Sequence, residues 1–413
     1  MTPDKLAITL WDFTWYTRSG PGEPFEDLDR AFAEAVERGY NAVRICAMPL
    51  LLFRSGLDTS AVRLGPFGGG YGDRVRWYDV GGVTTIDARE RLLELFRAAR
   101  RHDCVVIPSS WEYQQSPAFA LDRGWYDAVS AIDPEDRAEA LADALADLVD
   151  LLVEHGLDDR VAFTELHNEV QAGRLTEGLS GDPVVALRPR LERGLARFAR
   201  RHPGRPVTVN YAQVPVGSMR GVPRTVDVAV FHPYVYGVLD ELLDEFALRD
   251  PSRPFPQDRA RRELLRPGAP DLADWAPPPR ERWRLDATIV GAREVYVHDW
   301  CDPGKWDAWL YDRYATHRTA MLQRLTTWIE AAADWAAETG VPLVFGEGWI
   351  GYTPLHGTFE EGPVGAAFCR TAAAEAARVG AWGSVVCSNA APHHPMWQDV
   401  ALQRECNALL RGH

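Results

Sequence analysis

Two glutamates stand at the ends of short apolar segments that lie far apart in a chain of 413 residues. Glu169 closes the segment Val161-Ala-Phe-Thr-Glu-Leu-His-Asn-Glu169, and Glu347 closes Val341-Pro-Leu-Val-Phe-Gly-Glu347. A carboxyl group at the point where a buried strand ends can be partly desolvated and still reach a bound molecule. Two such groups predict paired carboxylate chemistry.

Polar and aromatic residues also follow the other apolar segments. The candidates for contact with a bound molecule are Trp11, Asp12, Arg44, Trp111, Glu112, Asn168, Asn210, His232, Tyr234, Trp349 and Asn389. In a parallel barrel the carboxyl ends of all strands meet at one face, so side chains from the whole length of the chain can converge there.

Strand-like and helix-like segments alternate almost throughout, which predicts a parallel sheet with helical crossovers. The expected strands are 6–13, 42–47, 104–109, one beginning at 161, 206–210, 226–231, one ending at 347, and 382–387. The expected helices are 25–38, 87–101, 134–155, 184–201, 309–338, 364–379 and 399–411. This order predicts an α/β fold, a single (β/α)8 TIM barrel over residues 1–413.

Two excursions interrupt the alternation. A glycine-rich segment, residues 65–82, lacks the spacing of a phosphate-binding loop and is predicted to be a flexible loop. A longer, proline-rich insertion, residues 237–307, follows the sixth strand. We expect it to form a lid or rim of the barrel instead of a separate core.

Composition excludes several classes of function. The net charge of -14 and a pI near 5.3 disfavour nucleic acid and anionic membranes as partners. Lys5 and Lys305 are the only lysines and neither ends a strand, so Schiff-base chemistry is set aside. No apolar run is long enough to span a bilayer, and the first residues lack the pattern of an export signal, so we expect a cytoplasmic protein. The scattered cysteines predict free buried thiols.

Four motifs resemble those of the retaining glycoside hydrolases of clan A, especially the family 5 cellulases. Gly39-Tyr-Asn-Ala-Val-Arg44 resembles their strand two, and Phe163-Thr-Glu-Leu-His-Asn-Glu169 resembles their strand four. Val230-Phe-His232-Pro-Tyr234 is similar to their strand six, and Phe345-Gly-Glu347 to the strand that carries their nucleophile. The motifs occur in the family's order and span nearly the whole predicted barrel.

The resemblance implies hydrolysis of a β-linked glycoside or short oligosaccharide by double displacement, with no cofactor and no metal. Glu169 would be the general acid/base and Glu347 the nucleophile. Asn168 would bind the sugar 2-hydroxyl, Arg44 and Tyr234 would contact the nucleophile, and His232 would contact the acid/base or the sugar. Tryptophans in loops and at strand ends could stack on sugar rings, and we expect about half of them to do so. They are Trp11, Trp15, Trp111, Trp300, Trp306, Trp349 and Trp397.

Two positions depart from the family pattern. Where the family has a histidine ending strand three, this chain has Ser110 followed by Trp111, and where it has a tryptophan ending strand eight, this chain has Cys387-Ser388-Asn389. The departures motivate an alternative, a sugar-binding cellulase-like protein with weak or no catalysis. The motifs name neither the sugar nor its linkage, and they leave the oligomeric state open.

A further alternative is a metal-dependent barrel hydrolase or isomerase that uses His167, His232 and the acids. No zinc motif supports it. The segment His298-Asp-Trp-Cys-Asp302 is interpreted as loop structure or rim contact. Glu165 lies four residues before Glu169, so in a strand both side chains point to the same face, with Glu165 deeper in the barrel. We therefore interpret Glu165 as an interior ion-pair partner of an arginine.

Overall fold

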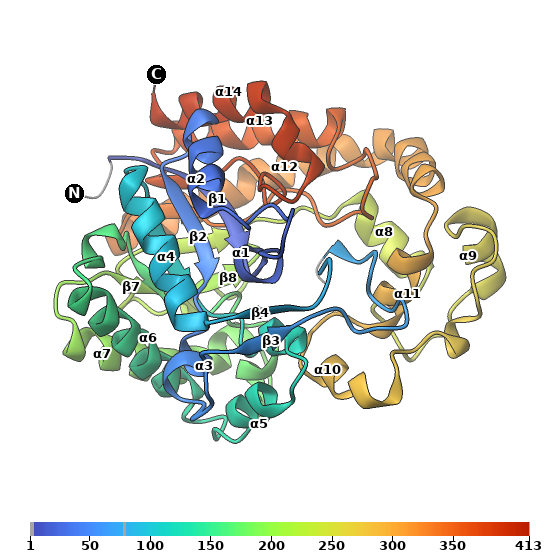
Figure 1. Ribbon diagram of the computed structural model, residues 1–413. Coiled ribbons are helices and arrows are strands. Elements are labelled where there is room, and N and C mark those ends of the chain that lie inside the picture. Colours follow the sequence, from blue (N-terminus) through green and yellow to red (C-terminus); the bar gives the residue numbers. More distant parts are fainter. Residues whose placement is uncertain (1–3, 77–79, 413) are drawn as a thin grey trace.

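The computed structural model describes residues 4–76 and 80–412, and its parallel strands are arranged in a ring surrounded by helices (Figure 1). The strands of the ring are β1 (Leu6–Asp12), β2 (Ala42–Cys46), β5 (Val105–Ser109), β6 (Thr164–Glu165), β7 (Val207–Thr208), β8 (Asn210–Ala212), β9 (Ala229–His232), β10 (Leu343–Phe345) and β11 (Gly383–Val385). Nearly all their residues are buried, as expected for parallel strands covered on both faces.

The strand pairing closes the ring. Seven strands form one sheet in the order β5-β2-β1-β11-β10-β9-β8. The opening between β5 and β8 is filled by residues 161–165, because Val161 pairs in parallel with Val106 and β6 pairs with β7. Since β7 and β8 are consecutive parts of one extended segment, the ring has eight members. The predicted (β/α)8 barrel is confirmed.

The outer layer consists mainly of seven helices. They are α2 (Leu28–Glu37), α4 (Ala88–Arg101), α6 (Arg137–Glu154), α7 (Pro183–Arg201), α12 (Pro303–Thr339), α13 (Pro363–Arg378) and α14 (Val400–Arg411). Local sequence explains where they begin. At α7, for example, the side chain of Asp182 accepts hydrogen bonds from the backbone N–H groups of Val184 and Val185, and Pro183 needs no such partner.

Shorter helices fill the loops. They are α1 (Thr14–Thr17), α3 (Pro49–Phe53), α5 (Gly124–Ser130), α8 (Val238–Glu245), α9 (Gln257–Glu263), α10 (Trp283–Asp286) and α11 (Ala292–Trp300). An antiparallel hairpin of β3 (Val62–Leu64) and β4 (Thr84–Ile86) flanks the glycine-rich excursion.

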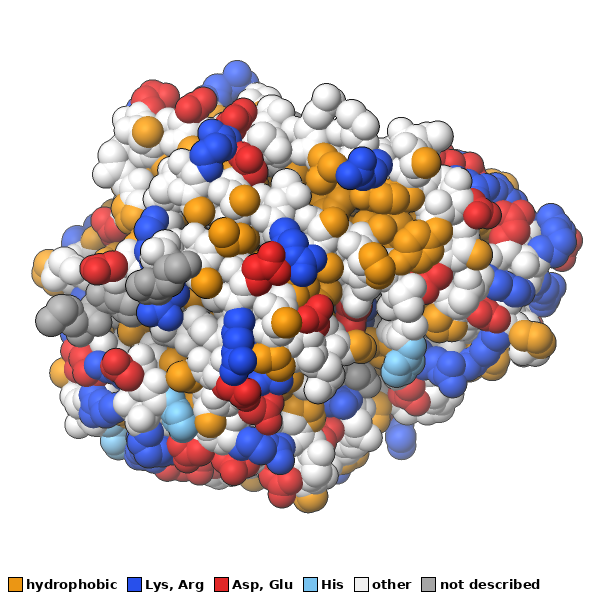
Figure 2. All heavy atoms as spheres, turned by 90° about the horizontal axis from the view of Figure 1, so that it is seen from above, with side chains coloured by type: hydrophobic (Ala, Val, Ile, Leu, Met, Phe, Trp, Pro, Cys, Tyr) orange, Lys and Arg blue, Asp and Glu red, His pale blue; other side chains and the backbone are white. Residues whose placement is uncertain are grey.

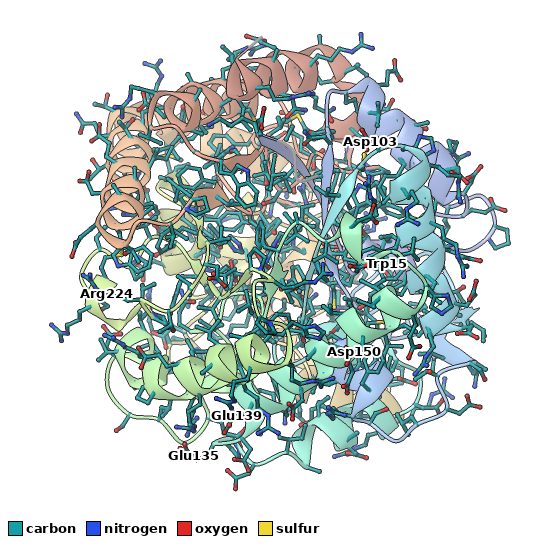
Figure 3. All side chains as sticks on the ribbon, turned by 90° about the vertical axis from the view of Figure 1, so that its left-hand side faces the viewer. Trp15, Asp103, Glu135, Glu139, Asp150 and Arg224 are labelled. Carbon is teal, nitrogen blue, oxygen red and sulfur yellow. The ribbon has the colours of Figure 1, made fainter. Side chains whose placement is uncertain are left out.

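The outer surface carries many arginine–carboxylate pairs. Glu135 lies within ion-pair distance of Arg190 and Arg193, and Glu139 of Arg193 and Arg197. Figure 3 shows Glu135 and Glu139 at the periphery of the molecule. Acidic and basic side chains are likewise interspersed on the face seen in Figure 2. Each exposed pair contributes only about 0–1 kcal/mol to stability.

The predicted insertion is shorter than expected at its end, because α12 already begins at Pro303. We use "the insertion" for residues 237–302, which carry α8 to α11. Its contacts with the barrel loops are specific: Asp299 accepts from the backbone N–H of Gly72, and the backbone N–H of Ile289 donates to the carbonyl of Gln114 at 3.0 Å. The insertion is therefore fixed to the rim from two sides.

Two further expectations concern cysteines and membranes. All six cysteines are buried free thiols, as predicted. Within the described part of the chain, no helix combines the length and apolar character needed to cross a bilayer.

Candidate active site

The two glutamates converge at the carboxyl ends of the strands. One carboxylate oxygen from each of Glu169 and Glu347 lies within 4.8 Å of the other and of a ring nitrogen of His232. Retaining glycosidases place their two carboxyl groups about 5 to 5.5 Å apart, whereas inverting enzymes need about 6.5 to 9.5 Å to admit a water molecule. The spacing of these two oxygens is closer to the first range than to the second.

Glu347 is held by two donors. Nη1 of Arg44 donates to its Oε1 at 2.7 Å, and the hydroxyl of Tyr234 donates to its Oε2 at 2.7 Å. Both contacts stabilise a carboxylate. The hydroxyl of Ser388, in the segment that lacks the family's tryptophan, lies 2.6 Å from the Tyr234 oxygen. Ser388 thus helps to orient the tyrosine instead of offering a stacking surface.

Arg44 is itself fixed from below. It is fully buried, and its Nε donates to Glu165 at 2.9 Å while Nη2 donates to Oδ1 of Asn168 at 2.7 Å. The interior ion pair expected for Glu165 is confirmed. Trp111 lies over the guanidinium, 4.7 Å from ring centre to Cζ, and covers its remaining face.

Glu169 lies in a different environment. Its backbone has a φ of +42°, a conformation that is uncommon for residues with a side chain, and its N–H donates to Oδ1 of Asn210 at 2.6 Å. Nε2 of Gln114 donates to its Oε2 at 3.0 Å. Burial raises the pKa of Glu169 above its usual range. A carboxyl group that keeps its proton closer to neutrality can act as a general acid.

His232 lies between the two acids. Its Nδ1 is 3.2 Å from Oε1 of Glu169 and 3.7 Å from Oε1 of Glu347. Burial lowers the pKa of His232 to about 4, so the ring is neutral at pH 7. The position below it requires glycine, because a Cβ on Gly346 would lie 2.9 Å from Nε2 of His232. The glycine of the Phe-Gly-Glu motif thus allows the histidine to approach the glutamate.

A cavity of about 940 Å³ opens above the acids, which is within the usual range for small-molecule sites. The barrel contributes polar and aromatic side chains to its lining, among them Asp12, Trp111, Gln114, Asn168, Tyr234 and Tyr352. The insertion contributes one wall, which includes Arg249, Trp275, Ile289 and Glu294. Burial raises the pKa of Asp12 to about 7, with its Oδ1 accepting from the N–H of Thr14.

Several predicted contact residues lie elsewhere. Trp11 is fully buried and packs edge-on against Phe25 and Phe32, beneath α2, with ring centres 5.1 and 4.6 Å apart. Trp349 is buried and donates its Nε1–H to the carbonyl of Val386 at 2.7 Å. Neither tryptophan lines the cavity. The prediction that they bind substrate is wrong, because both rings face the helix layer or the core.

Three polar predictions are also corrected. Glu112 has all its acceptor positions occupied by neighbours, including the N–H groups of Leu50 and Leu51 at the start of α3. Asn210 lies beneath the site, where it bonds to Glu165 and to the backbone of Glu169. Asn389 is buried away from the cavity lining. These residues build the site or the core without reaching a ligand.

Among the loop tryptophans, Trp111 lines the cavity, whereas Trp15, Trp300, Trp306 and Trp397 are not among its lining residues. Trp275, from the proline-rich part of the insertion, lines it instead. Trp275, Arg249, Gln114 and Tyr352 were not expected from the sequence. They belong to loops without a recognisable motif.

A metal centre that includes His167 does not fit the donor atoms. His167 uses both ring nitrogens: Nδ1 lies 2.6 Å from the carbonyl of Asn168, and Nε2 accepts from the N–H of Tyr113 at 3.0 Å. Asp299 accepts from Gly72 and Arg74. Of the residues that the structure describes, Glu169, His232 and Glu347 are the one group of three potential ligands with closely spaced atoms.

Comparison with known proteins concerns the family and the fold. Residues 8–174 match the model of the cellulase-like family, described as sugar-binding cellulase-like. This part of the chain, less than half of its length, is similar to that family. The resemblance inferred from the motifs is therefore confirmed, and the matched region contains Arg44, Asn168 and Glu169. Among curated proteins, none matches the chain significantly.

Solved structures share the fold. A protein from Parabacteroides distasonis, provisionally described as a glycoside hydrolase, is 20% identical, with 98% of this chain and 93% of that chain covered and a TM-score of 0.66. The endo-1,4-beta-mannanase from Rhizomucor miehei is 9% identical, with 99% and 95% of the two chains covered and a TM-score of 0.51. At these identities the similarity concerns the barrel alone.

Proposed function

We propose that this protein is a retaining glycoside hydrolase that acts on a β-linked glycoside or short oligosaccharide. The observation that carries the proposal is the close approach of the Glu169 and Glu347 carboxylates, within 4.8 Å, in two unlike environments. Glu347 receives two strong donors, whereas burial raises the pKa of Glu169. These environments suit Glu347 as the nucleophile and Glu169 as the proton donor.

In the first step Glu169 protonates the glycosidic oxygen while a carboxylate oxygen of Glu347 bonds to the anomeric carbon. The bond between that carbon and the leaving oxygen breaks, and a glycosyl ester forms. In the second step the ionised Glu169 takes a proton from water as the water oxygen attacks the same carbon, which releases Glu347 as a carboxylate. The reaction needs no cofactor.

The cavity supports a small substrate. The insertion closes one side of the mouth through its contacts with the loops after β2 and β5, so a long polymer has no open groove to follow on that side. Aromatic faces from Trp111 and Trp275 and the carboxyl of Asp12 suit a polyhydroxylated ring, which offers both apolar C–H faces and hydroxyl donors.

The test is covalent trapping. A 2-deoxy-2-fluoro aryl β-glycoside should inactivate the protein and leave its glycosyl group on the peptide that contains Glu347, read by mass spectrometry. Glu347→Gln should show neither labelling nor turnover, while Glu330→Gln, at an exposed surface ion pair, should keep both. First-formed product of inverted configuration, seen by NMR, would contradict the proposal.

A second candidate is a protein that binds sugar without efficient turnover. Two observations favour it: the matching family is described as sugar-binding, and Ser388 stands where the family's sugar-stacking tryptophan is expected. Calorimetry with short oligosaccharides, followed by product analysis of the same mixtures, separates the two candidates. Binding without any released sugar, across a broad panel, would favour this second function.

A further inference from the structure

Gln114 forms hydrogen bonds with both residues of the Asn-Glu motif, Asn168 and Glu169, although it is not part of that motif. It lies in the loop after β5, near the point where the family places its strand-three histidine, and it is 5% exposed. Its Oε1 accepts from Nδ2 of Asn168 at 2.8 Å, and its Nε2 donates to Oε2 of Glu169 at 3.0 Å. One side-chain amide thus contacts both neighbours.

The direction of these hydrogen bonds is fixed by Arg44. A guanidinium can only donate, so Oδ1 of Asn168 must be the acceptor of its 2.7 Å bond. Nδ2 of Asn168 therefore points to Gln114, whose Oε1 must accept. The remaining end of the Gln114 amide is a donor, and it faces Glu169. A polar chain runs from the guanidinium to the carboxyl.

We propose that Gln114 is a positioning residue for the acid/base, which orients the carboxyl of Glu169 and takes the place of the missing strand-three histidine. The inference rests on the proposed function, since it assigns the second residue of that mechanism a partner. Because Oε2 of Glu169 receives an N–H donor, the proton of the neutral acid belongs on Oε1, the oxygen nearer to His232.

Gln114 also connects the site to the insertion. Its backbone carbonyl accepts from the N–H of Ile289, which lines the cavity. The packing is close at this point, since a Cβ on Gly173 would lie 2.6 Å from the carbonyl oxygen of Tyr113 and 3.2 Å from Ile289. The wall of the cavity and the acid/base are therefore held by the same residue.

The donor from Gln114 stabilises the ionised form of Glu169, against the effect of burial. The other charged or titratable groups that act on this carboxyl are Arg44 from β2, His232 from β9, Glu347 after β10, Arg249 from the insertion, and the hydroxyls of Tyr234, Tyr236 and Tyr352. The two arginines favour the ionised form, the neutral histidine is near Oε1, and Glu347 disfavours it. Loss of the Gln114 donor removes one interaction that favours the ionised form of Glu169.

The test compares Gln114→Met with the native protein. Methionine keeps the length of the side chain and removes the donor. The titration midpoint of Glu169, followed by ¹³C NMR of labelled glutamate and assigned with Glu169→Gln, should rise by about one pH unit. The basic limb of kcat/KM for an unactivated β-glycoside should move upward by the same amount. An unchanged midpoint and limb would overturn the inference.

The control is Gln171→Met, because Gln171 lines the same cavity but bonds to the backbone of Ala212. In Gln171→Met the titration midpoint of Glu169 should stay at the native value. If Gln114→Met does not fold, Gln114→Glu serves instead and should raise the midpoint further, and a native value there would count against the inference. The titration needs no turnover, so it decides the role of Gln114 even if no glycoside is cleaved.

Discussion

Arg44 donates a 2.7 Å hydrogen bond to Glu347 from the interior of the barrel, where its own side chain is fully buried. The same guanidinium bonds to Glu165, which is also fully buried. The charge that orients the proposed nucleophile is thus part of the core, and its removal has both a functional and a structural effect.

Arg44→Met should therefore lose both activity and stability. The substitution leaves Glu165 buried without its charged partner, for which we expect a loss of about 3–5 kcal/mol in the free energy of unfolding. Urea unfolding measures that loss, and a double variant with Glu165→Gln should recover part of it. A single variant as stable as the native protein would show that the buried pair contributes little.

Glu169→Gln should depend on the leaving group. For an alkyl or sugar leaving group, which needs protonation, kcat/KM should fall by about 10²–10⁴. For a dinitrophenyl glycoside the same constant should change little, while kcat falls because no base activates water in the second step. Added azide should restore kcat by attacking the glycosyl ester. Equal losses on both substrates would argue against an acid/base role.

Glu112→Gln tests a structural role. Both carboxylate oxygens accept: Oε1 from Leu51 and Trp125, Oε2 from Leu50 and Ser110. An amide nitrogen at either position would face donors, and we expect about 1–3 kcal/mol of destabilisation for each group left unsatisfied. Thermal unfolding should show the loss, while kcat/KM of the folded fraction stays near native. If the substitution changed KM alone, Glu112 would be a substrate-binding residue after all.

The contributions of Asp12 and Glu112 to stability should fall as pH rises from about 5 to 8. Burial raises the pKa of both Asp12 and Glu112 to about 7, whereas in the unfolded chain such groups titrate near 4. Between these values each of the two groups binds more protons in the folded state, so its contribution to the free energy of unfolding decreases with pH. Five histidines, among them His232, have pKa values lowered by burial and act in the opposite sense at acid pH, so the contribution of Asp12 is read as the difference in urea midpoint between the native protein and Asp12→Asn at pH 5, 6, 7 and 8. A difference that stays constant across this range would contradict the shift.

Trp275→Ala should weaken sugar binding although Trp275 lies in no motif. The ring lines the cavity and is oriented by its Nε1–H, which donates to Asp299 at 2.9 Å. We expect KM to rise about tenfold, which corresponds to ~1.4 kcal/mol. Trp349→Phe is the matched control, since that ring is buried outside the cavity. A larger change in KM for the control would place the stacking surface elsewhere.

The barrel was predictable because parallel strands covered on both faces appear as short apolar runs, and the site residues follow those runs directly. The errors concern residues at strand ends whose side chains point away from the cavity. Asp12 lines the cavity and Trp11, its neighbour in β1, must then face outward, beneath α2. Alternation alone could have excluded Trp11.

Other features had no local signal. Gln114 acquires its role only when the loop after β5 meets the Asn-Glu motif, and Trp275 only when the insertion meets the loop after β2. Contacts of this kind depend on how long loops pack, which periodicity and motif spacing do not encode. Glu165 was assigned correctly because it lies within a strand, where direction follows from position.

The wall of the cavity joins two surface excursions, one between β2 and β5 and the other between β9 and α12, through Asp299 and Gly72. Neither excursion supplies the paired acids or Arg44. Selection can therefore change the entrance by exchanging these two segments together, while the strands that carry the paired acids and Arg44 stay unchanged. Among barrels that share this acid pair, we expect preferences for different sugars to diverge first in these segments.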